Sequence, residues 1–246
     1  MLKKYIIVTG SSGCIGTGIS NVFKSNGYSV LGIDISPPSH DFCDHFLIFD
    51  FYRLVNSSRS SKIFFDKINK HIEGHILSGI VHCAGFQELD SQSLEDIESF
   101  LKHQCINSAS SFLMYRLFFD KLSKFNGQFI NIGSIHSALT KDGFASYAAS
   151  KSSLRSLTKS FSIENKGAFR IFSIEPAAID TPMLRAGFLN EEKFNLLKNY
   201  HPVGDIGKPL ELAKFLYLLF TSDSLFLHGS IIDFSGGISG KLHDPD

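Results

Sequence analysis

The chain has 246 residues, 43% of them hydrophobic, so it is long enough to bury the core of one large domain. Its 24 basic and 24 acidic residues cancel and form no charged block, which gives no electrostatic reason to expect nucleic acid or an anionic membrane as a partner. No apolar run approaches the ~20 residues that cross a bilayer, and the four cysteines form no C-x-x-C pair, so we expect a reduced, cytoplasmic setting.

The first predicted element is a buried strand at residues 4–8, followed by the glycine loop TGSSGCIG and an apolar-periodic helix. A strand, a glycine loop and a helix in this order present backbone N–H groups and a helix N-terminus to a pyrophosphate. The spacing is G-x-x-G-x-x-G rather than the common G-x-G-x-x-G, and a plain glycine turn is the alternative. As a cofactor loop, it is predicted to supply contacts from Gly10, Ser12, Gly13, Cys14, Ile15 and Gly16.

The second predicted strand, residues 29–33, ends at Asp34. A carboxylate at this strand tip can accept hydrogen bonds from the hydroxyls of an adenosine ribose, and it repels a 2′-phosphate. No Arg or Lys stands at residues 11–13 or just after Asp34 to neutralise such a phosphate. We therefore predict NAD(H) rather than NADP(H) as the cofactor, the alternative being that Asp34 only caps a loop.

The next two strand ends add candidate contacts for the adenosine. A short strand at residues 46–49 ends at Asp50, whose carboxylate can reach an adenine amine with Phe51 beside it. A fourth strand, residues 79–82, ends in Cys83, Ala84 and Gly85, small residues that let a cofactor lie against the chain.

One pair of histidines has the spacing of metal ligands. His71 and His75 are four residues apart at the end of a predicted helix over residues 60–72. Gly74 interrupts that helix, and no third ligand is evident in the sequence. We therefore predict solvated histidines and no metal site.

A long helical pattern then runs from residue 93 to about residue 124, with Asn107 near its middle. An asparagine among apolar helix residues is costly unless its amide is hydrogen-bonded. Two interpretations remain open: Asn107 holds a bend and a water molecule, or it bonds to a neighbouring loop.

A phenol and an amine follow on one predicted helix. Tyr147 and Lys151, in the run YAASK, are four residues apart and therefore share a helix face. A free tyrosine has a pKa of about 10, and a nearby ammonium favours the phenolate, so we expect Lys151 to lower the pKa of Tyr147. Ser134 follows a buried strand that ends at residue 132, and its hydroxyl can meet the tyrosine across a cleft and polarise a carbonyl. For the Tyr-x-x-x-Lys pattern alone, ordinary helix decoration is the alternative.

The sixth predicted strand, residues 170–174, runs into a loop stiffened by Pro176 and Pro182. In this loop Ile179 can offer backbone groups to a carboxamide, and Thr181 can offer its hydroxyl. The segment at about residues 183–205 follows directly, so we expect it to form a mobile lid over the substrate. A helix at residues 210–220 and a strand at residues 230–233 complete the chain.

Strands and helices alternate along the whole sequence, without a repeat, a low-complexity tract or a domain linker. This order predicts an α/β fold. It would be a single doubly wound Rossmann domain over residues 1–246, with about seven parallel strands and helices on both faces.

Together these segments resemble the short-chain dehydrogenase/reductase family, in its compact single-domain branch, over nearly the whole chain. The glycine loop resembles the cofactor loop of the family, and residues 83–85 resemble its Asn-Ala-Gly stretch. The catalytic set of the family corresponds in order and spacing to Asn107, Ser134, Tyr147 and Lys151. The resemblance also implies cofactor contacts from Tyr147, Lys151, Pro176, Ile179 and Thr181.

Several positions depart from the family pattern. Cys14 replaces the middle glycine of the compact branch, and His82 with Cys83 replaces Asn-Asn. Ala177 replaces a glycine, and Asp205 replaces a usual arginine. The glycine spacing is closer to that of the extended branch, which includes sugar-nucleotide epimerases and dehydratases. That branch normally adds a substrate domain after the sixth strand, for which this chain is short.

The resemblance implies an NAD(H)-dependent oxidoreductase that interconverts a secondary alcohol and a ketone by hydride transfer. Tyr147 would exchange the alcohol proton, and Ser134 would hold the substrate oxygen. Lys151 would assist the tyrosine and bond the nicotinamide ribose, while Asn107 would hold a water that links Lys151 to solvent. A 3-oxoacyl thioester, a sugar or polyol, and a steroid-like ketone are the candidate substrates. A sugar-nucleotide epimerase or dehydratase and a non-catalytic NAD-binding protein are the alternatives.

Self-association is a further implication of the resemblance. A homodimer or homotetramer would form through the helices that contain Asn107 and Tyr147, and through the last strand. The first of these helices carries more apolar residues than one buried face requires, among them Phe112, Leu113, Leu117 and Phe118.

Overall fold

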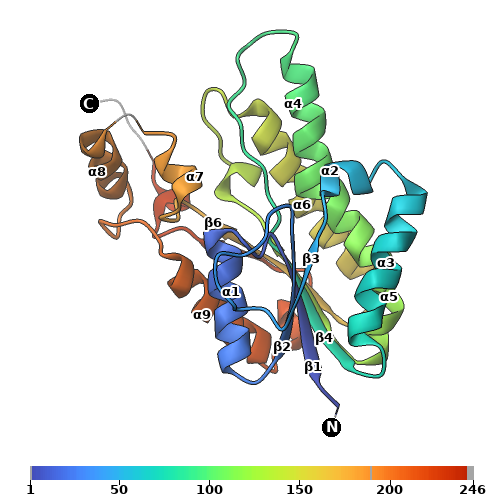
Figure 1. Cartoon of the computed structure of the whole chain (residues 1–246). Helices are drawn as coiled ribbons and strands as arrows, with labels where there is room; N and C mark the ends of the chain where they lie inside the picture. Colours follow the sequence, from blue (N-terminus) through green and yellow to red (C-terminus); the bar gives the residue numbers. More distant parts are fainter. Residues whose placement is uncertain (1, 189, 243–246) are drawn as a thin grey trace.

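The computed structural model describes residues 2–188 and 190–242, and in this part of the chain it forms a seven-stranded sheet with helices on both sides (Figure 1). Neighbouring strands all pair in parallel, in the order β3-β2-β1-β4-β5-β6-β7. The predicted doubly wound α/β fold is therefore confirmed. The strands are β1 Lys4–Thr9, β2 Ser29–Asp34, β3 His45–Ile48, β4 Ile76–His82, β5 Gln128–Ile132, β6 Arg170–Pro176 and β7 Ile231–Phe234.

The helices lie between and beyond these strands. The α-helices are α1 Cys14–Ser25, α2 Phe51–Leu54, α3 Ser58–Ile72, α4 Asp96–His103, α5 Ser110–Lys124, α6 Ala145–Glu164, α7 Pro182–Arg185, α8 Glu191–Tyr200 and α9 Pro209–Thr221. A π-helical segment, η1, spans Gln104–Ala109, and short 3₁₀ segments span η2 Ile135–Ser137, η3 Leu225–Leu227 and η4 Ile238–Gly240.

Both faces of the sheet are covered, which explains the continuous apolar run of its first strand. Successive side chains of a strand point to opposite faces. In β1, Tyr5 and Ile7 pack into the core that includes residues of α3, α5 and α6. Ile6 and Val8 pack into the second core, on the side of α1 and α9 (Figure 1).

The order of the strands reverses beside β1, because β2 and β3 extend the sheet on one side of it and β4 to β7 on the other. In open parallel sheets, ligands bind outside the carboxyl ends of the strands at such a reversal. The glycine loop follows β1 and residues 83–85 follow β4, so both segments lie at this point.

Three local predictions differ from the structure. The long helix around Asn107 is interrupted by the π-helical segment η1. Strand β6 continues through Glu175 and Pro176, which were expected to lie in the following loop. A short helix, α2, begins at Phe51, where no helix was predicted.

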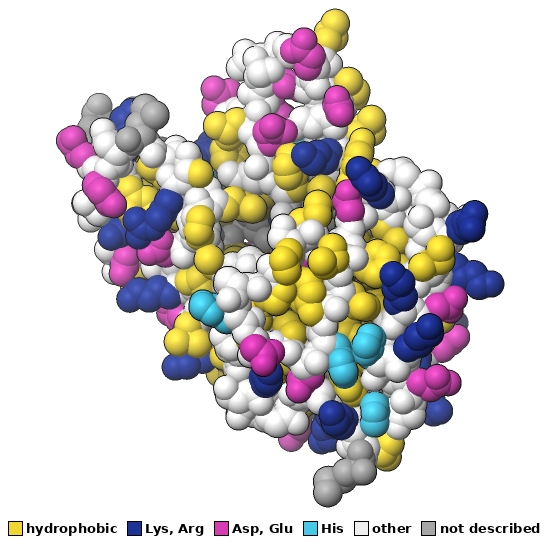
Figure 2. Space-filling model, viewed as in Figure 1, with side chains coloured by type: hydrophobic (Ala, Val, Ile, Leu, Met, Phe, Trp, Pro, Cys, Tyr) yellow, Lys and Arg dark blue, Asp and Glu magenta, His cyan; other side chains and the backbone are white. Residues whose placement is uncertain are grey.

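The segment predicted to form a lid contains α7 and α8, which lie to one side of the sheet (Figure 1). The space-filling view shows the surface hollowed between this segment and the arm that carries α4 (Figure 2). None of the helices in the described part of the chain has both the length and the apolar character needed to cross a membrane.

Candidate active site

The glycine loop is shaped by close backbone contacts. Gly10 has a φ of +64°, and a Cβ added there would lie 2.8 Å from the backbone of Ala84. A Cβ at Gly16 would lie 2.1 Å from the carbonyl oxygen of Gly10, whereas one at Gly13 would lie 3.4 Å from it. Gly13 is the N-cap of α1, whose first N–H groups have no partner within the helix. The loop therefore has the shape and the donors that a pyrophosphate requires.

Asp34 ties the glycine loop to the end of β2. Its Oδ2 accepts the backbone N–H of Ser12 at 2.9 Å, and its Oδ1 accepts those of Ile35 at 2.7 Å and Ser36 at 3.3 Å. The Ser12 hydroxyl donates to the carbonyl of Ser36 at 2.7 Å. Asp34 thus caps its loop, as the alternative interpretation expected. Its Oδ2 has a single donor and keeps acceptor capacity for a further hydroxyl.

The two residues predicted to contact the adenine, Asp50 and Phe51, have different surroundings. Asp50 is the N-cap of α2 and accepts the backbone N–H of Tyr52 at 2.9 Å. The Phe51 side chain is buried in the core, where its ring contacts those of Phe64 and His82. The side chain of Phe51 therefore stabilises the fold, and only its backbone remains for a ligand.

His82, at the end of β4, is the centre of a buried hydrogen-bond chain. Its Nδ1 lies 3.1 Å from Thr9 Oγ1, and its Nε2 lies 3.0 Å from Ser110 Oγ. The Ser110 hydroxyl donates its proton to the carbonyl of Ile106 at 2.6 Å. His82 Nε2 must therefore donate to Ser110, and Nδ1 accepts from Thr9. Burial lowers the pKa of His82 to about 3, which keeps this ring neutral.

The same chain holds the glycine loop against the end of β4. Thr9 Oγ1 accepts the backbone N–H groups of Cys83 at 3.1 Å and of Ala84 at 3.0 Å. Burial raises the pKa of the Cys83 thiol to about 12, so this cysteine is protonated at neutral pH. The His-Cys pair that replaces Asn-Asn in the family pattern therefore supports the loop through neutral groups.

Asn107 lies fully buried within η1 and is bonded to a loop. Its Oδ1 accepts the backbone N–H of Phe86 at 2.7 Å. Its Nδ2 donates to the carbonyl of Phe86 at 2.9 Å and to Ser150 Oγ at 2.8 Å. Both amide protons are used, so the loop-bonding interpretation fits the side chain. The tethered residue lies within the π-helical turn, a geometry that is frequent at functional sites.

Ser134, Tyr147 and Lys151 meet at the carboxyl ends of β5 and β6. The Ser134 hydroxyl accepts the backbone N–H of His136 at 3.2 Å, and it lies near enough to the Tyr147 side chain to favour the phenolate. Lys151 Nζ lies 5.7 Å from the centre of the Tyr147 ring and donates to the carbonyl of Ile132 at 3.0 Å.

Gly85 links this group to the end of β4. A Cβ placed on Gly85 would lie 3.8 Å from Lys151 Nζ and 3.9 Å from Asn107 Oδ1. The structure thus brings together the amine, the amide and the small residues that follow β4, as the sequence predicted for one site.

The pKa of Tyr147 moves in the direction opposite to the prediction. Burial raises it to about 12, although the nearby Ser134 hydroxyl favours the phenolate. Lys151 Nζ lies 5.7 Å from the centre of the ring, and burial lowers the pKa of this lysine to about 8. In this structure Tyr147 is therefore a neutral phenol at pH 7, which is the form that donates a proton.

The loop after β6 carries the remaining predicted contacts. Pro176 is the last residue of β6, and Ile179 forms a parallel bridge with Gly207. Thr181 is the N-cap of α7, where its hydroxyl oxygen accepts the backbone N–H of Leu184 at 3.2 Å. The proton of this hydroxyl is left to donate to a ligand.

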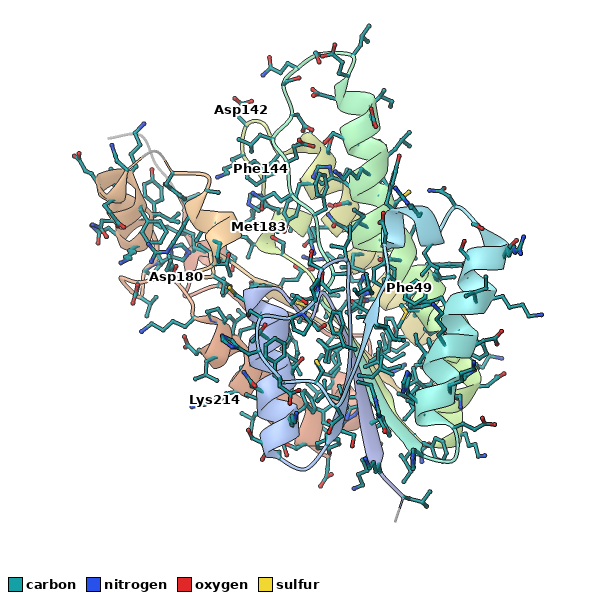
Figure 3. All side chains as sticks on the ribbon, viewed as in Figure 1. Phe49, Asp142, Phe144, Asp180, Met183 and Lys214 are labelled. Atoms are coloured by element: carbon teal, nitrogen blue, oxygen red, sulfur yellow. The ribbon has the colours of Figure 1, made fainter. Side chains whose placement is uncertain are left out.

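The sequence analysis missed a group of aromatic rings around Tyr147. The rings of His103, His136 and Phe144 lie 6.2, 5.8 and 5.9 Å from that of Tyr147. Phe144 and Met183, which belongs to the segment predicted to form a lid, lie on the two sides of the hollow (Figure 3). One signal was available, because His136 follows Ser134 by two residues. The tertiary contacts themselves could not be read from the sequence.

The two histidines with the spacing of metal ligands, His71 and His75, each pack against another ring. His71 packs against His45 of β3, with ring centres 4.4 Å apart, and His75 stacks on Tyr5 at 5.4 Å. Across residues 2–188 and 190–242, no group of three or more His, Cys, Asp or Glu side chains has an arrangement that could hold a metal ion.

Comparison with known proteins agrees with this geometry. Residues 10–239 match a family model described as enoyl-(acyl carrier protein) reductase, one of the short-chain dehydrogenase/reductase models. The chain belongs to the short-chain dehydrogenase/reductase family. The predicted family and the predicted class of enzyme, a short-chain dehydrogenase/reductase, are therefore confirmed.

Three relatives illustrate the range of the family. The chain is 28% identical to the 2,5-dichloro-2,5-cyclohexadiene-1,4-diol dehydrogenase LinX of Sphingobium indicum over 66% of its own length and 62% of that protein's. It is 31% identical to the 3-oxoacyl-[acyl-carrier-protein] reductase FabG of Thermotoga maritima over 46% of each chain. The matches thus span about three fifths or less of these two relatives. The ligand-free aldohexose dehydrogenase of Thermoplasma acidophilum shares the fold, with a TM-score of 0.89 and 24% identity, over 100% of this chain and 98% of that one.

Proposed function

We propose that this protein is an NAD(H)-dependent oxidoreductase that interconverts a secondary alcohol and a ketone. One observation carries the proposal: the Tyr147 ring, the Ser134 hydroxyl and the buried amine of Lys151 meet beside the segments that follow β1 and β4, at the strand reversal where open parallel sheets bind ligands. The catalytic residues of the proposal are Asn107, Ser134, Tyr147 and Lys151.

The residues at the strand ends fit a nicotinamide dinucleotide. The loop around Gly10 and Gly16 leaves no room for side chains, and α1 presents free N–H groups above it. Asp34 would accept a hydroxyl of the adenosine ribose and disfavour a 2′-phosphate. Ile179 and Thr181 would bind the carboxamide end. The bound cofactor supplies the hydride, which is chemistry that the protein side chains cannot provide.

The side chains of the site handle the proton and the substrate oxygen. In the reduction direction, Tyr147 donates its phenolic proton to the carbonyl oxygen as the alcohol forms, and Ser134 holds that oxygen by a second hydrogen bond. The positive charge of Lys151 stabilises the phenolate that remains. Asn107 keeps the π-helical turn in place through its bonds to Phe86 and Ser150. Proton transfer of this kind contributes about 10²–10⁴-fold in rate.

Two substrate classes follow from the relatives and from the walls of the site. FabG reduces a 3-oxoacyl group on a carrier protein and LinX oxidises a cyclic diol, as their names state. The rings of His103, His136 and Phe144 beside Tyr147 could pack against the acyl chain of a thioester or against the apolar face of a sugar ring. We therefore propose a 3-oxoacyl thioester or a sugar or polyol as the substrate.

The remaining properties are proposed on the same basis. Residues 1–246 act as one NAD(P)-binding domain, and residues 183–205 act as a lid over the substrate. The protein works in the cytoplasm as a homodimer or homotetramer, without nucleic acid or membrane as a partner. Phe112 and Leu117 of α5 remain partly exposed on the helix predicted for self-association, which supports this arrangement.

A cofactor and substrate screen tests the proposal. Alcohols and ketones of both classes are offered with each nicotinamide cofactor, and the absorbance of the reduced nicotinamide is followed. We expect turnover with NAD(H) and tighter binding of NADH than of NADPH. Asp34→Ala should weaken NADH binding by about tenfold, through loss of a charge-assisted hydrogen bond. It should also reduce the difference between the affinities for NADH and NADPH. Nucleotide binding without turnover of any compound would contradict the proposal. Conversion of a nucleotide sugar without net change in NADH would indicate an epimerase.

A further inference from the structure

A buried carboxylate lies behind the candidate active site, and the proposed mechanism does not use it. Glu175, near the end of β6, is 1% exposed. Its Oε2 accepts hydrogen bonds from Arg155 Nη1 at 2.9 Å and from the Ser137 hydroxyl at 2.7 Å. Its Oε1 is buried and has no hydrogen-bond partner among the described residues. Burying a carboxylate costs several kcal/mol before its partners compensate, so its position here calls for an explanation.

The side chain of Glu175 contacts the catalytic turn on both sides of Ser134. A Cβ placed on Gly133, just before the serine, would lie 2.9 Å from Cγ of Glu175. Ser137 ends the 3₁₀ turn that begins after the serine, and its carbonyl accepts the Ser152 hydroxyl of α6 at 2.8 Å. Glu175 thus contacts the segment from Gly133 to Ser137, which determines the position of Ser134.

Glu175 also lies close to the lysine of the site. Lys151 Nζ donates to the carbonyl of Ile132 at 3.0 Å, and Gly133, the next residue, packs against Cγ of Glu175. Burial lowers the pKa of Lys151, whereas Cys83 and the carboxylate of Glu175 oppose this effect.

Burial raises the pKa of Glu175 itself, while Ser137, Arg155 and Lys151 favour its ionised form. The negative charge of Asp233 in β7 has the opposite effect and favours the protonated form of Glu175. Within the described residues, Glu175 is thus the carboxylate whose charge supports the ammonium of Lys151.

We propose that Glu175 is a positioning residue of this active site: it fixes the turn that carries Ser134 and stabilises the ammonium of Lys151. Arg155, one helical turn after Lys151, holds the carboxylate in place. The inference rests on the proposed function, because that function gives Ser134 and Lys151 their roles.

A purely structural ion pair is the competing explanation. Such a pair contributes to folding, or merely to packing, and has no particular effect on the chemistry. A loss of stability in a variant is therefore expected from both explanations and does not distinguish them. The decisive readouts are the rate of turnover, compared with cofactor affinity, and the protonation of Lys151.

Glu175→Gln is the main variant, because it removes the charge and keeps the shape. With the fastest ketone of the screen, we expect kcat to fall by about 10–100-fold, the effect of misplacing catalytic groups, while the Kd for NADH stays unchanged. Glu164→Gln is the matched control. It removes a carboxylate from the pair with Arg116, at 3.0 Å on the exposed side of α5 and α6, and should leave kcat unchanged.

A second measurement needs no substrate. In protein labelled with ¹³C at lysine Cε, the Lys151 signal, assigned with Lys151→Met, should titrate at a lower pH in Glu175→Gln than in the native protein and in Glu164→Gln. Ser137→Ala separates the two contributions, because it loosens the turn and leaves the charge in place. It should lower kcat without moving the lysine titration. It also serves as the test of the turn if Glu175→Gln does not fold.

The inference is overturned if Glu175→Gln turns over at the native rate, or if the Lys151 titration does not move. It is likewise overturned if Ser137→Ala keeps the native kcat. These results are distinct from a failure of the proposed function, which would appear as turnover by Tyr147→Phe. An inactive Tyr147→Phe combined with a fully active Glu175→Gln would remove the present inference alone.

Discussion

The sheet edge that carries the candidate active site and the segment proposed to be a lid are built in opposite ways. At the edge, Asn107, Lys151 and Ser134 are 0, 4 and 6% exposed, and each side chain is hydrogen-bonded to a backbone group. In the proposed lid, Met183 and Leu196 are 51 and 55% exposed. The two regions have different requirements. Groups that hold reacting atoms need fixed positions, whereas a segment that opens to admit substrate moves more easily when little of its surface is buried.

The largest effect should come from the glycine loop, where the edge is most tightly packed. Gly16→Ala places a Cβ 2.1 Å from the carbonyl of Gly10 and should abolish NADH binding. The backbone shift should also cost about 1–3 kcal/mol of the free energy of unfolding. Gly13→Ala is the matched control for stability, because its Cβ would lie 3.4 Å from the same atom and its φ is −71°. NADH titration measures binding, and chemical denaturation measures the free energy of unfolding. An equal loss of stability in the two variants would show that the loop is not sterically closed.

The second-largest effect should be on the pH dependence of stability, through the buried hydrogen-bond chain that contains His82. Its pKa is about 3 in the folded protein against 6.5 as the ordinary value, so below pH 6.5 the unfolded chain binds a proton that the folded protein refuses. This contribution to stability is complete above pH 6.5 and is lost as the pH falls towards 3, at up to about 1.4 kcal/mol per pH unit.

His82→Asn isolates this contribution. His136, whose pKa burial lowers to about 4, titrates in both proteins and cancels in the comparison. The unfolding free energy of His82→Asn should therefore depend less steeply on pH between 6.5 and 4 than that of the native protein. Urea denaturation across this range measures the difference. Parallel curves would mean that His82 is not buried as a neutral ring.

The smallest effect should come from the lid. Arg185 bonds Asp180 at 2.6 and 2.9 Å and lies over the ring of Phe194, but the two charged side chains are 46 and 35% exposed. Exposed pairs contribute about 0–1 kcal/mol, so Arg185→Ala should lower Tm by at most about 4 °C. It should raise KM for the substrate and leave kcat and NADH affinity unchanged. Arg116→Ala, in an exposed pair away from the lid, is the control. A fall in kcat with an unchanged KM would place the lid in the chemistry instead.

The parts of the fold that follow from local pattern were predictable from the sequence. The alternation of strands and helices predicted the sheet. Ser134 was predicted to follow a strand end, and Tyr147 and Lys151 were predicted to share a helix face that meets it across a cleft. The carboxyl ends of parallel strands lie at one edge of the sheet, so the segments that follow them lie close together.

The rest depends on contacts between segments that are distant in the chain. At the π-helical turn the Asn107 side chain bonds the backbone of Phe86, and this contact cannot be read from the periodicity of the sequence. The prediction that the pKa of Tyr147 is lowered was wrong, because burial raises this pKa and has a larger effect than the nearby Lys151. Phe51 was placed beside a cofactor because it follows a strand end, but its side chain packs into the core.

The central claim is that Tyr147 carries the proton of the reaction. Tyr147→Phe keeps the ring contacts of the site and removes only the hydroxyl. Purified variant and native protein are each loaded with NADH, mixed with the best ketone of the screen, and followed by the decay of NADH absorbance in a single turnover. We predict unchanged NADH affinity and a rate about 10²–10⁴-fold lower than native. A single-turnover rate equal to that of the native protein would contradict the account.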